Sequence, residues 1–173
     1  KKSVGIFSIE IMNDNKELNF SPNYQRSSVW KKKQKQLLID SLLIKFDIPK
    51  IYLHDTQDIN GNDIYDVVDG QQRLKAIIGF LNDEFGLKSD MYSDYNGKVF
   101  SDLPSELQMQ FKGIQVDICY LTGGFQPIDI EDMFLRLQNG TTLNPAEKRR
   151  GLQSKYTMCA VERKLSQHRG FDF

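Results

Sequence analysis

One continuous stretch, residues 64–81, constrains the fold more than any other part of the sequence. Its first five residues are rich in β-branched and aromatic side chains, which predicts a buried strand over residues 64–68. Asp69-Gly70 then interrupts the run, and apolar residues recur at the spacing i, i+3, i+4 and i+7. This spacing predicts an amphipathic helix over residues 71–82. Its buried face is expected to consist of Leu74, Ile77, Ile78 and Leu81.

The junction between this strand and this helix has the chemistry of an anion site. The first N–H groups of a helix lack internal partners, and the helix dipole is positive at that end. Gly70 has no side chain to block a ligand, Arg73 adds a planar charged fork that suits phosphate, and Gln71 and Gln72 add donors. The junction therefore predicts a phosphate site. The alternative is a common Asp-Gly turn followed by a solvated arginine.

Composition limits the classes of protein to which the chain can belong. With 173 residues and 39% hydrophobic content, one domain with a substantial core is expected, with or without an appendage. The net charge is zero, which argues against nucleic-acid binding by bulk charge alone. No run is apolar and long enough to predict a transmembrane helix or a signal peptide. Cys119 and Cys159 are far apart and are interpreted as buried thiols of a cytoplasmic protein. The chain starts without Met and is expected to be a fragment.

The remaining pattern mixes strands and helices without regular βαβ alternation, which predicts an α+β fold with a mixed sheet. Further strands are expected at residues 4–12, 50–54 and 114–121, with two weak strands around Asn96-Gly97 in residues 85–100 and an extended entry at residues 18–22. Further helices are expected at residues 29–44, from Pro104 to Gly113, at 130–138, from Asn144 and at 156–165.

Two basic runs are candidates for contact with DNA phosphates. Lysines crowd the start of the predicted helix 29–44, although cations there oppose the helix dipole. The alternative is a solvated helix face. Nearby aromatic residues could stack on bases or simply pack: Trp30, Tyr24 and Tyr52. The candidate nucleic-acid residues are Lys31, Lys32, Lys33, Lys148, Arg149 and Arg150.

Three motifs then carry a resemblance to a known family. They are Tyr24-Gln25-Arg26 with Trp30, Asp69-Gly70-Gln71-Gln72-Arg73, and Phe134-Leu135-Arg136-Leu137-Gln138-Asn139-Gly140 followed by Leu143-Asn144 and Glu147. In this order they resemble the N-terminal domain of GmrSD-type modification-dependent restriction enzymes, which is related to the ParB/sulfiredoxin fold. The resemblance runs from about Phe20 to Gly151, and the DGQQR run is its most specific part.

The resemblance implies a domain, residues 1–151, that binds and hydrolyses a nucleoside triphosphate (GTP, ATP or CTP) with Mg²⁺. Residues 152–173 would then begin a following helical segment. The implied nucleotide-binding residues are Gly70, Gln71, Gln72, Arg73, Tyr24, Arg26, Arg136 and Asn139. The implied catalytic residues are Asp69, Gln72 and Arg73, with Asp69 as metal ligand. The implied partners are DNA and an HNH-type nuclease domain or subunit, with a homo-oligomer as a further expectation.

Three functions stay open on the sequence alone. The domain could hydrolyse a nucleotide, it could bind one without turnover and act through its partner, or it could be a ParB-like DNA-binding or nuclease domain. An HNH site needs histidines, and only His54 and His168 exist, in unrelated contexts. There is also no G-x-x-x-x-G-K-[ST] run, so the chain is not a P-loop protein.

Overall fold

The computed structural model describes residues 1–20, 29–57, 61–122 and 129. The chain divides into two compact units, Lys1–Glu131 and Asp132–Phe173. The second unit lies outside the described residues, and so do the predicted domain boundary at residue 151 and the helices predicted after residue 130.

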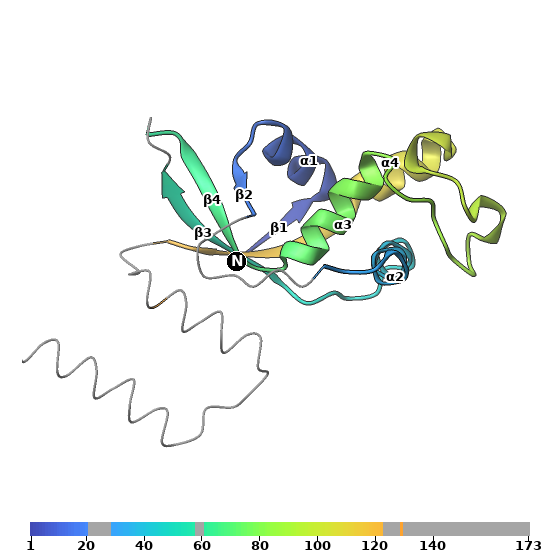
Figure 1. The fold of residues 1–173 in the computed structure, drawn as a ribbon, viewed down its shortest axis with the longest axis horizontal. Coiled ribbons are helices and arrows are strands. Elements are labelled where there is room, and N and C mark those ends of the chain that lie inside the picture. The colour runs from blue at the N-terminus through green and yellow to red at the C-terminus, as the bar shows by residue number, and fades with distance from the viewer. Residues whose placement is uncertain (21–28, 58–60, 123–128, 130–173) are drawn as a thin grey trace, which may run out of the picture. The chain divides into compact units, whose positions relative to one another are not determined.

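The described part of the first unit forms a mixed sheet with helices, which confirms the α+β class (Figure 1). The strands are β1 (Lys2–Gly5), β2 (Leu18–Asn19), β3 (Ile51–Gln57), β4 (Asp63–Asp69) and β5 (Gln115–Leu121). Their order in the sheet is β1-β5-β3-β4-β2. Central strand β3 runs antiparallel to β4 and parallel to β5, while β2 runs parallel to β4 and β1 antiparallel to β5. The carboxyl ends of β2 and β4 and the start of β3 therefore share one edge of the sheet.

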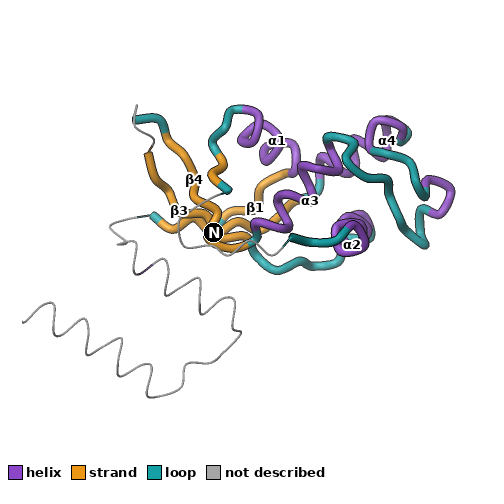
Figure 2. Tube along the Cα trace, viewed as in Figure 1, coloured by secondary structure: helices purple, strands orange, loops and turns teal. Residues whose placement is uncertain are grey.

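The helices are α1 (Ile6–Asp14), α2 (Lys32–Leu43), α3 (Gln71–Leu81) and α4 (Ser105–Gly113). Helix α3 packs against both α1 and α2, and Figure 2 shows it among the other helices beside the sheet. Short 3₁₀ turns occupy Ser93–Tyr95 and Phe100–Asp102. The core lies between sheet and helices, and its fully buried members include Ile51, Leu53, Val67, Leu74, Ile77 and Phe80.

Most predicted elements of the described region are confirmed within a few residues: β3, β4, β5, α2, α3 and α4. Helix α2 starts at Lys32, so Trp30 precedes it instead of lying within it. On α3, Leu74 and Ile77 are buried as predicted, but Ile78 and Leu81 are only partly buried. Because α3 packs on two helices and contributes to the common core, its buried stripe also takes in Ala76 and Phe80.

The strand predicted over residues 4–12 is wrong. The strand ends at Gly5, and helix α1 takes over from Ile6. Ile6 and Ile9 are buried at the helical spacing i, i+3, whereas Phe7 and Ile11 are 55% and 42% exposed. The apolar residues of this run fit both periods loosely, and packing of α1 on α3 and α4 selects the helix.

The two weak strands predicted within residues 85–100 are also wrong. The Leu87 main-chain N–H donates to the Lys98 carbonyl at 2.8 Å, and Gly97 has the predicted turn conformation at φ +86°. However, Phe85 and Leu87 are both buried along with the intervening glycine, so the pattern does not alternate as a strand requires.

The prediction of buried cysteine thiols also needs correction. Cys119 is a free cysteine, but it is only half-buried, and Cys159 lies outside the described residues.

Candidate functional site

Gly70 makes the turn from strand β4 directly into helix α3. Its φ is +94°, in the left-handed region that favours glycine. A Cβ atom at this position would lie 2.8 Å from Ile51 Cγ1 and 3.2 Å from Arg73 Nη2. Both the backbone conformation and the lack of space therefore require glycine. The abrupt turn leaves the first N–H groups of α3 at the edge of the sheet, as the strand-to-helix pattern predicts.

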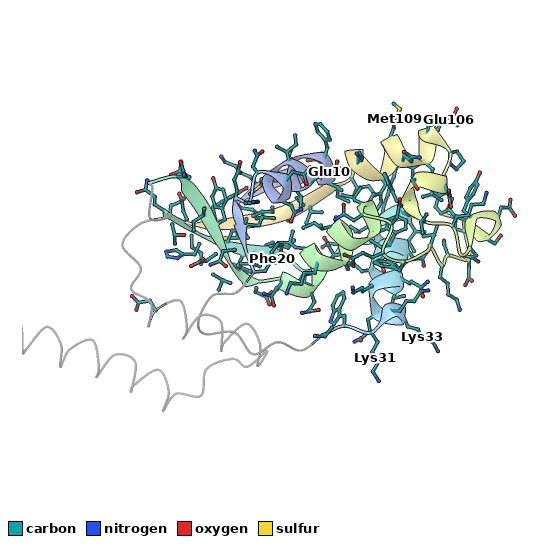
Figure 3. All side chains as sticks on the ribbon, turned by 45° about the horizontal axis from the view of Figure 1, so that its top comes forward. Glu10, Phe20, Lys31, Lys33, Glu106 and Met109 are labelled. Atoms are coloured by element: carbon teal, nitrogen blue, oxygen red, sulfur yellow. The ribbon has the colours of Figure 1, made fainter. Side chains whose placement is uncertain are left out.

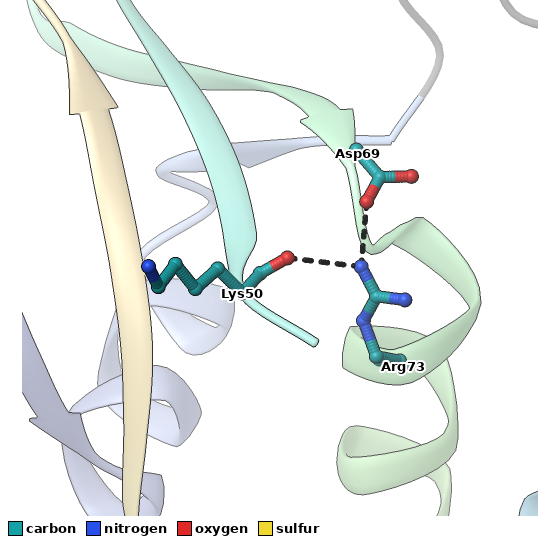
Figure 4. A network of polar contacts seen from close by, with 3 residues as sticks. All are labelled: Lys50, Asp69 and Arg73. Atoms are coloured by element: carbon teal, nitrogen blue, oxygen red, sulfur yellow. Dashed lines mark hydrogen bonds and ion pairs between the residues drawn. The ribbon is translucent and has the colours of Figure 1, made fainter. Parts of the chain in front are cut away.

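Arg73 lies on the first turn of α3 and reaches back to the sheet. Its Nη2 atom donates to Asp69 Oδ2 at 2.6 Å and to the main-chain carbonyl of Lys50 at 3.0 Å (Figure 4). The Arg73 and Asp69 side chains are only 14% and 20% exposed. The guanidinium therefore connects the end of β4, the start of α3 and the residue that precedes β3.

The Arg73 guanidinium keeps further hydrogen-bonding capacity at this junction. Both of these hydrogen bonds use Nη2, and within the part of the chain that the structure describes, Nε is buried without a hydrogen-bond partner. A guanidinium carries five N–H donors in a fixed fork. A buried donor that stays unsatisfied costs about 1–3 kcal/mol. Arg73 is therefore a structural ion-pair partner whose guanidinium has donors beyond those that hold Asp69 and the Lys50 carbonyl.

Gln72 connects the same turn to the segment that leads into helix α2. Its Oε1 atom accepts a hydrogen bond of 3.0 Å from the main-chain N–H of Trp30, and this contact is partly buried. Gln71, next to it, is half-buried. Nothing in the sequence signals the Gln72–Trp30 contact, because the two residues are 42 positions apart.

Further cationic side chains lie at the start of α2 and on α3. Lys31, Lys32 and Lys33 have exposed side chains, and Figure 3 shows Lys31 and Lys33 projecting outward at the start of α2. Lys75, one turn after Gln71 on α3, places Nζ 5.5 Å from the centre of the Phe20 ring. The sequence prediction did not include Lys75 or Phe20, although Lys75 follows Gln71 at the i, i+4 spacing of one helix face.

The structure thus brings together the five residues of the DGQQR run at the edge of the sheet. It places Lys31, Lys32 and Lys33 at the start of α2, directly after Trp30, which bonds to Gln72 of that run. The other predicted site residues lie outside the described residues: Tyr24, Arg26, Arg136, Asn139, Lys148, Arg149 and Arg150.

A metal ion at this junction would have few protein ligands. Among the residues that the structure describes, no group of three or more His, Cys, Asp or Glu side chains could hold one. Asp69 supplies one carboxylate here, and its Oδ2 atom contacts Arg73. Mg²⁺ is commonly held by one or two carboxylates together with substrate phosphates, so Asp69 suits a metal that arrives with a nucleotide.

Fold and site together define an α+β domain with a donor-rich corner, built around the Arg73–Asp69 ion pair, where a strand enters a helix. The family described as the N-terminal domain of GmrSD restriction endonuclease matches residues 9–154, and the chain belongs to this family. It is therefore a domain of a restriction or defence protein. No curated protein and no solved structure matches the chain significantly. Among the described helices, none has the length and apolar character needed to cross a membrane.

Proposed function

We propose that this domain binds a nucleoside triphosphate at the first turn of α3, hydrolyses it with Mg²⁺ and thereby regulates a nuclease of a DNA restriction system. The observation that carries the proposal is Arg73. Asp69 and the Lys50 carbonyl hold its guanidinium at a helix N-terminus, and its Nε atom is buried without a partner in the described chain.

In this proposal the phosphates bind where several donors converge. The N–H groups of the first turn of α3 offer hydrogen bonds, and the helix dipole favours an anion there. Arg73 adds charge, and its bond to Asp69 fixes the direction of the guanidinium before a ligand arrives. Gly70 allows the close approach of a phosphate to the main chain, since a side chain at this position is excluded.

Hydrolysis needs more positive charge than Arg73 supplies, because the transferred phosphoryl group spreads its charge over several oxygens. Mg²⁺, when bound, neutralises part of this charge and aligns the phosphates. We assign Asp69 as the residue that would hold the metal or a water ligand of it, while its Oδ2 atom continues to orient Arg73. GTP, ATP and CTP are equally compatible with these contacts, because every contact is made with the phosphates that the three nucleotides share.

Membership of a restriction endonuclease family supports the proposal of a nuclease partner. We propose that an HNH-type nuclease domain or subunit cleaves DNA while this domain binds the nucleotide, that the system acts in the cytoplasm, and that copies of the chain can associate. Tyr24, Arg26, Arg136 and Asn139 are proposed to complete the nucleotide site. Lys148, Arg149 and Arg150 are proposed to contact DNA.

A second candidate function is direct DNA binding without nucleotide turnover. The observation in its favour is the row of exposed lysines at the start of α2, Lys31 to Lys33. Their charge is local, since the whole chain carries no net charge. The two candidates differ in one requirement, because only the first needs a nucleotide.

Isothermal titration calorimetry with GTP, ATP and CTP, each with and without MgCl₂, tests the proposal, with phosphate release as the second readout. We expect at least one nucleotide to bind and Mg²⁺ to be needed for turnover. Asp69→Asn keeps an acceptor for Arg73 but removes the charge, so it should retain binding and lose turnover. Asp83→Asn, at the opposite end of α3, is the matched control and should retain both. Absence of binding heat with all three nucleotides would refute the nucleotide site and favour the DNA-binding candidate.

A further inference from the structure

The hydrogen bond between Gln72 and Trp30 joins two parts of the molecule with different proposed tasks. Gln72 lies in the first turn of α3, and Trp30 precedes the basic start of α2. The donor is the Trp30 main-chain N–H, so the accepting atom of the carboxamide must be its oxygen. The Gln72 oxygen therefore restrains the segment that leads into α2.

The Gln72–Trp30 hydrogen bond restrains the main chain just before the row of lysines, Lys31 to Lys33. Lys31 directly follows Trp30 and is the N-cap residue of α2, and Lys32 and Lys33 occupy its first turn. The Lys31 main-chain N–H donates at 2.9 Å to Oε1 of Gln34 in α2. Two neighbouring main-chain N–H groups are thus held by two glutamine side chains. Only the bond from Gln72 crosses to α3.

We propose that Gln72 is a positioning residue that couples nucleotide binding at the first turn of α3 to the basic start of α2. This inference rests on the proposed nucleotide site. A phosphate bound to the first-turn N–H groups restrains the backbone that carries Gln72. Because the Gln72 oxygen holds the Trp30 N–H, this restraint passes to Trp30 and to the lysines that follow it. Coupling by restraint needs no large change of shape.

Hydrogen exchange of the backbone amides tests this coupling, with GTP, ATP and CTP used separately at saturating concentration in the presence of MgCl₂. We expect a nucleotide that binds to slow exchange in residues 70–74 and also in residues 29–36 of the wild-type chain. The second effect should be at least about fivefold, the lower end of typical coupling between sites. Trp30 is the only tryptophan of the chain, so its fluorescence gives an independent readout of the same segment.

Three variants separate the coupling from plain binding. Gln72→Ala removes the acceptor and should lose the slowing at residues 29–36 while residues 70–74 remain slowed at saturation. Gln72→Asn keeps an uncharged carboxamide but shortens the side chain by one methylene, so its oxygen no longer reaches the Trp30 N–H and this variant should also lose the slowing at residues 29–36. Gln34→Ala is the matched control, because it removes the neighbouring glutamine-to-backbone bond without touching α3. It should retain both effects.

Any other result overturns the proposed coupling, and some results also overturn the proposed nucleotide site. If residues 29–36 stay slowed in Gln72→Ala or in Gln72→Asn, the Gln72 oxygen is not the coupling element. If the wild-type chain is slowed only at residues 70–74, the coupling is absent but the nucleotide site stands. If the wild-type chain shows neither slowing nor binding heat, the proposed function itself fails, and the coupling fails with it.

Discussion

The two ends of helix α3 are built from different chemistry. At its amino end, half-buried polar groups meet: Gln72 with the Trp30 N–H, and Arg73 with Asp69 and the Lys50 carbonyl. At its carboxyl end, Phe80 is fully buried among aromatic rings. Its ring centroid lies 5.7 Å from those of Phe85 and Phe100 and 5.3 Å from that of Phe111.

The two ends therefore have different roles: the carboxyl end stabilises the helix, and the amino end carries the groups of the candidate site. Aromatic rings bury a large apolar area, and edge-to-face pairs add to it, so the carboxyl end anchors the helix in the core. At the amino end Leu74 is buried, but the three residues before it are polar and only partly buried, and Arg73 retains an unsatisfied Nε donor within the described chain. A helix fixed firmly at one end can carry donors at the other end without losing its position.

The largest effect on stability is expected at the carboxyl end. Phe80→Ala should lower the free energy of unfolding by about 3–5 kcal/mol, because it removes a fully buried ring and leaves a cavity. Phe46→Ala is the control, since Phe46 is 66% exposed and its loss should cost less than about 0.5 kcal/mol. Urea unfolding followed by circular dichroism measures both. Equal losses would contradict the assignment of the carboxyl end as the anchor.

A pair of glycines sharpens the comparison next. Gly70 and Gly97 have similar φ values of +94° and +86°, but only Gly70 is crowded, while a Cβ at Gly97 meets nothing within 4 Å. Gly97→Ala should cost about 1–2 kcal/mol for the left-handed backbone alone. Gly70→Ala should cost about 1–3 kcal/mol more, because the new methyl group collides with Ile51. Thermal unfolding measures the difference, and equal costs would mean that Ile51 gives way freely.

The basic start of α2 should affect DNA binding and leave the core intact. If Lys31, Lys32 and Lys33 each contact a phosphate, replacing all three with Glu should weaken binding to duplex DNA. Each lost contact should flatten the dependence of log K on log salt by about 0.9. Fluorescence anisotropy of a labelled duplex at several salt concentrations measures the slope. An unchanged slope would assign these lysines to a solvated helix face.

The smallest effect concerns Asp83, just beyond the carboxyl end of α3. The Ser101 main-chain N–H donates to Asp83 Oδ1 at 2.9 Å and lowers the pKa of this carboxyl from its ordinary value of 3.8. A lowered pKa in the folded state adds stability above pH 3.8, and this stability is lost as the pH falls through the lowered value. The difference in melting temperature between the wild type and Asp83→Asn should therefore shrink under acid. A difference independent of pH would contradict this assignment.

Local sequence patterns predict the amino end of α3 better than the rest of the fold. The strand, the Asp-Gly break and the helical spacing of Leu74 and Ile77 all agree, so β4, Gly70 and α3 appear where expected. Residues 4–12 satisfy two periods equally loosely, and only the packing of α1 on its neighbours decides between strand and helix. The strand prediction for residues 85–100 fails for a similar reason, because packing in the aromatic cluster determines which of these side chains are buried.

The partners of the site residues could not be predicted, because they come from distant parts of the chain. Arg73 and Asp69 form a local i, i+4 pair that spacing makes plausible. The Lys50 carbonyl and the Trp30 N–H are main-chain groups, 23 and 42 positions from Arg73 and Gln72. Every non-proline residue carries such groups, so no residue type marks them in the sequence.

The nucleotide affinity of Arg73→Ala tests the central claim most directly. A charge-assisted hydrogen bond to phosphate is worth about 1.5–3 kcal/mol. The Kd for the bound nucleotide should therefore rise about tenfold to more than a hundredfold. Arg73→Lys should restore only part of the affinity, because it keeps the charge and loses the planar fork. Calorimetry should be paired with circular dichroism at the same temperature, to establish that both variants are folded. If Arg73→Ala is largely unfolded while its folded fraction binds with unchanged affinity, Arg73 is only the structural partner of Asp69 and the phosphate site is contradicted.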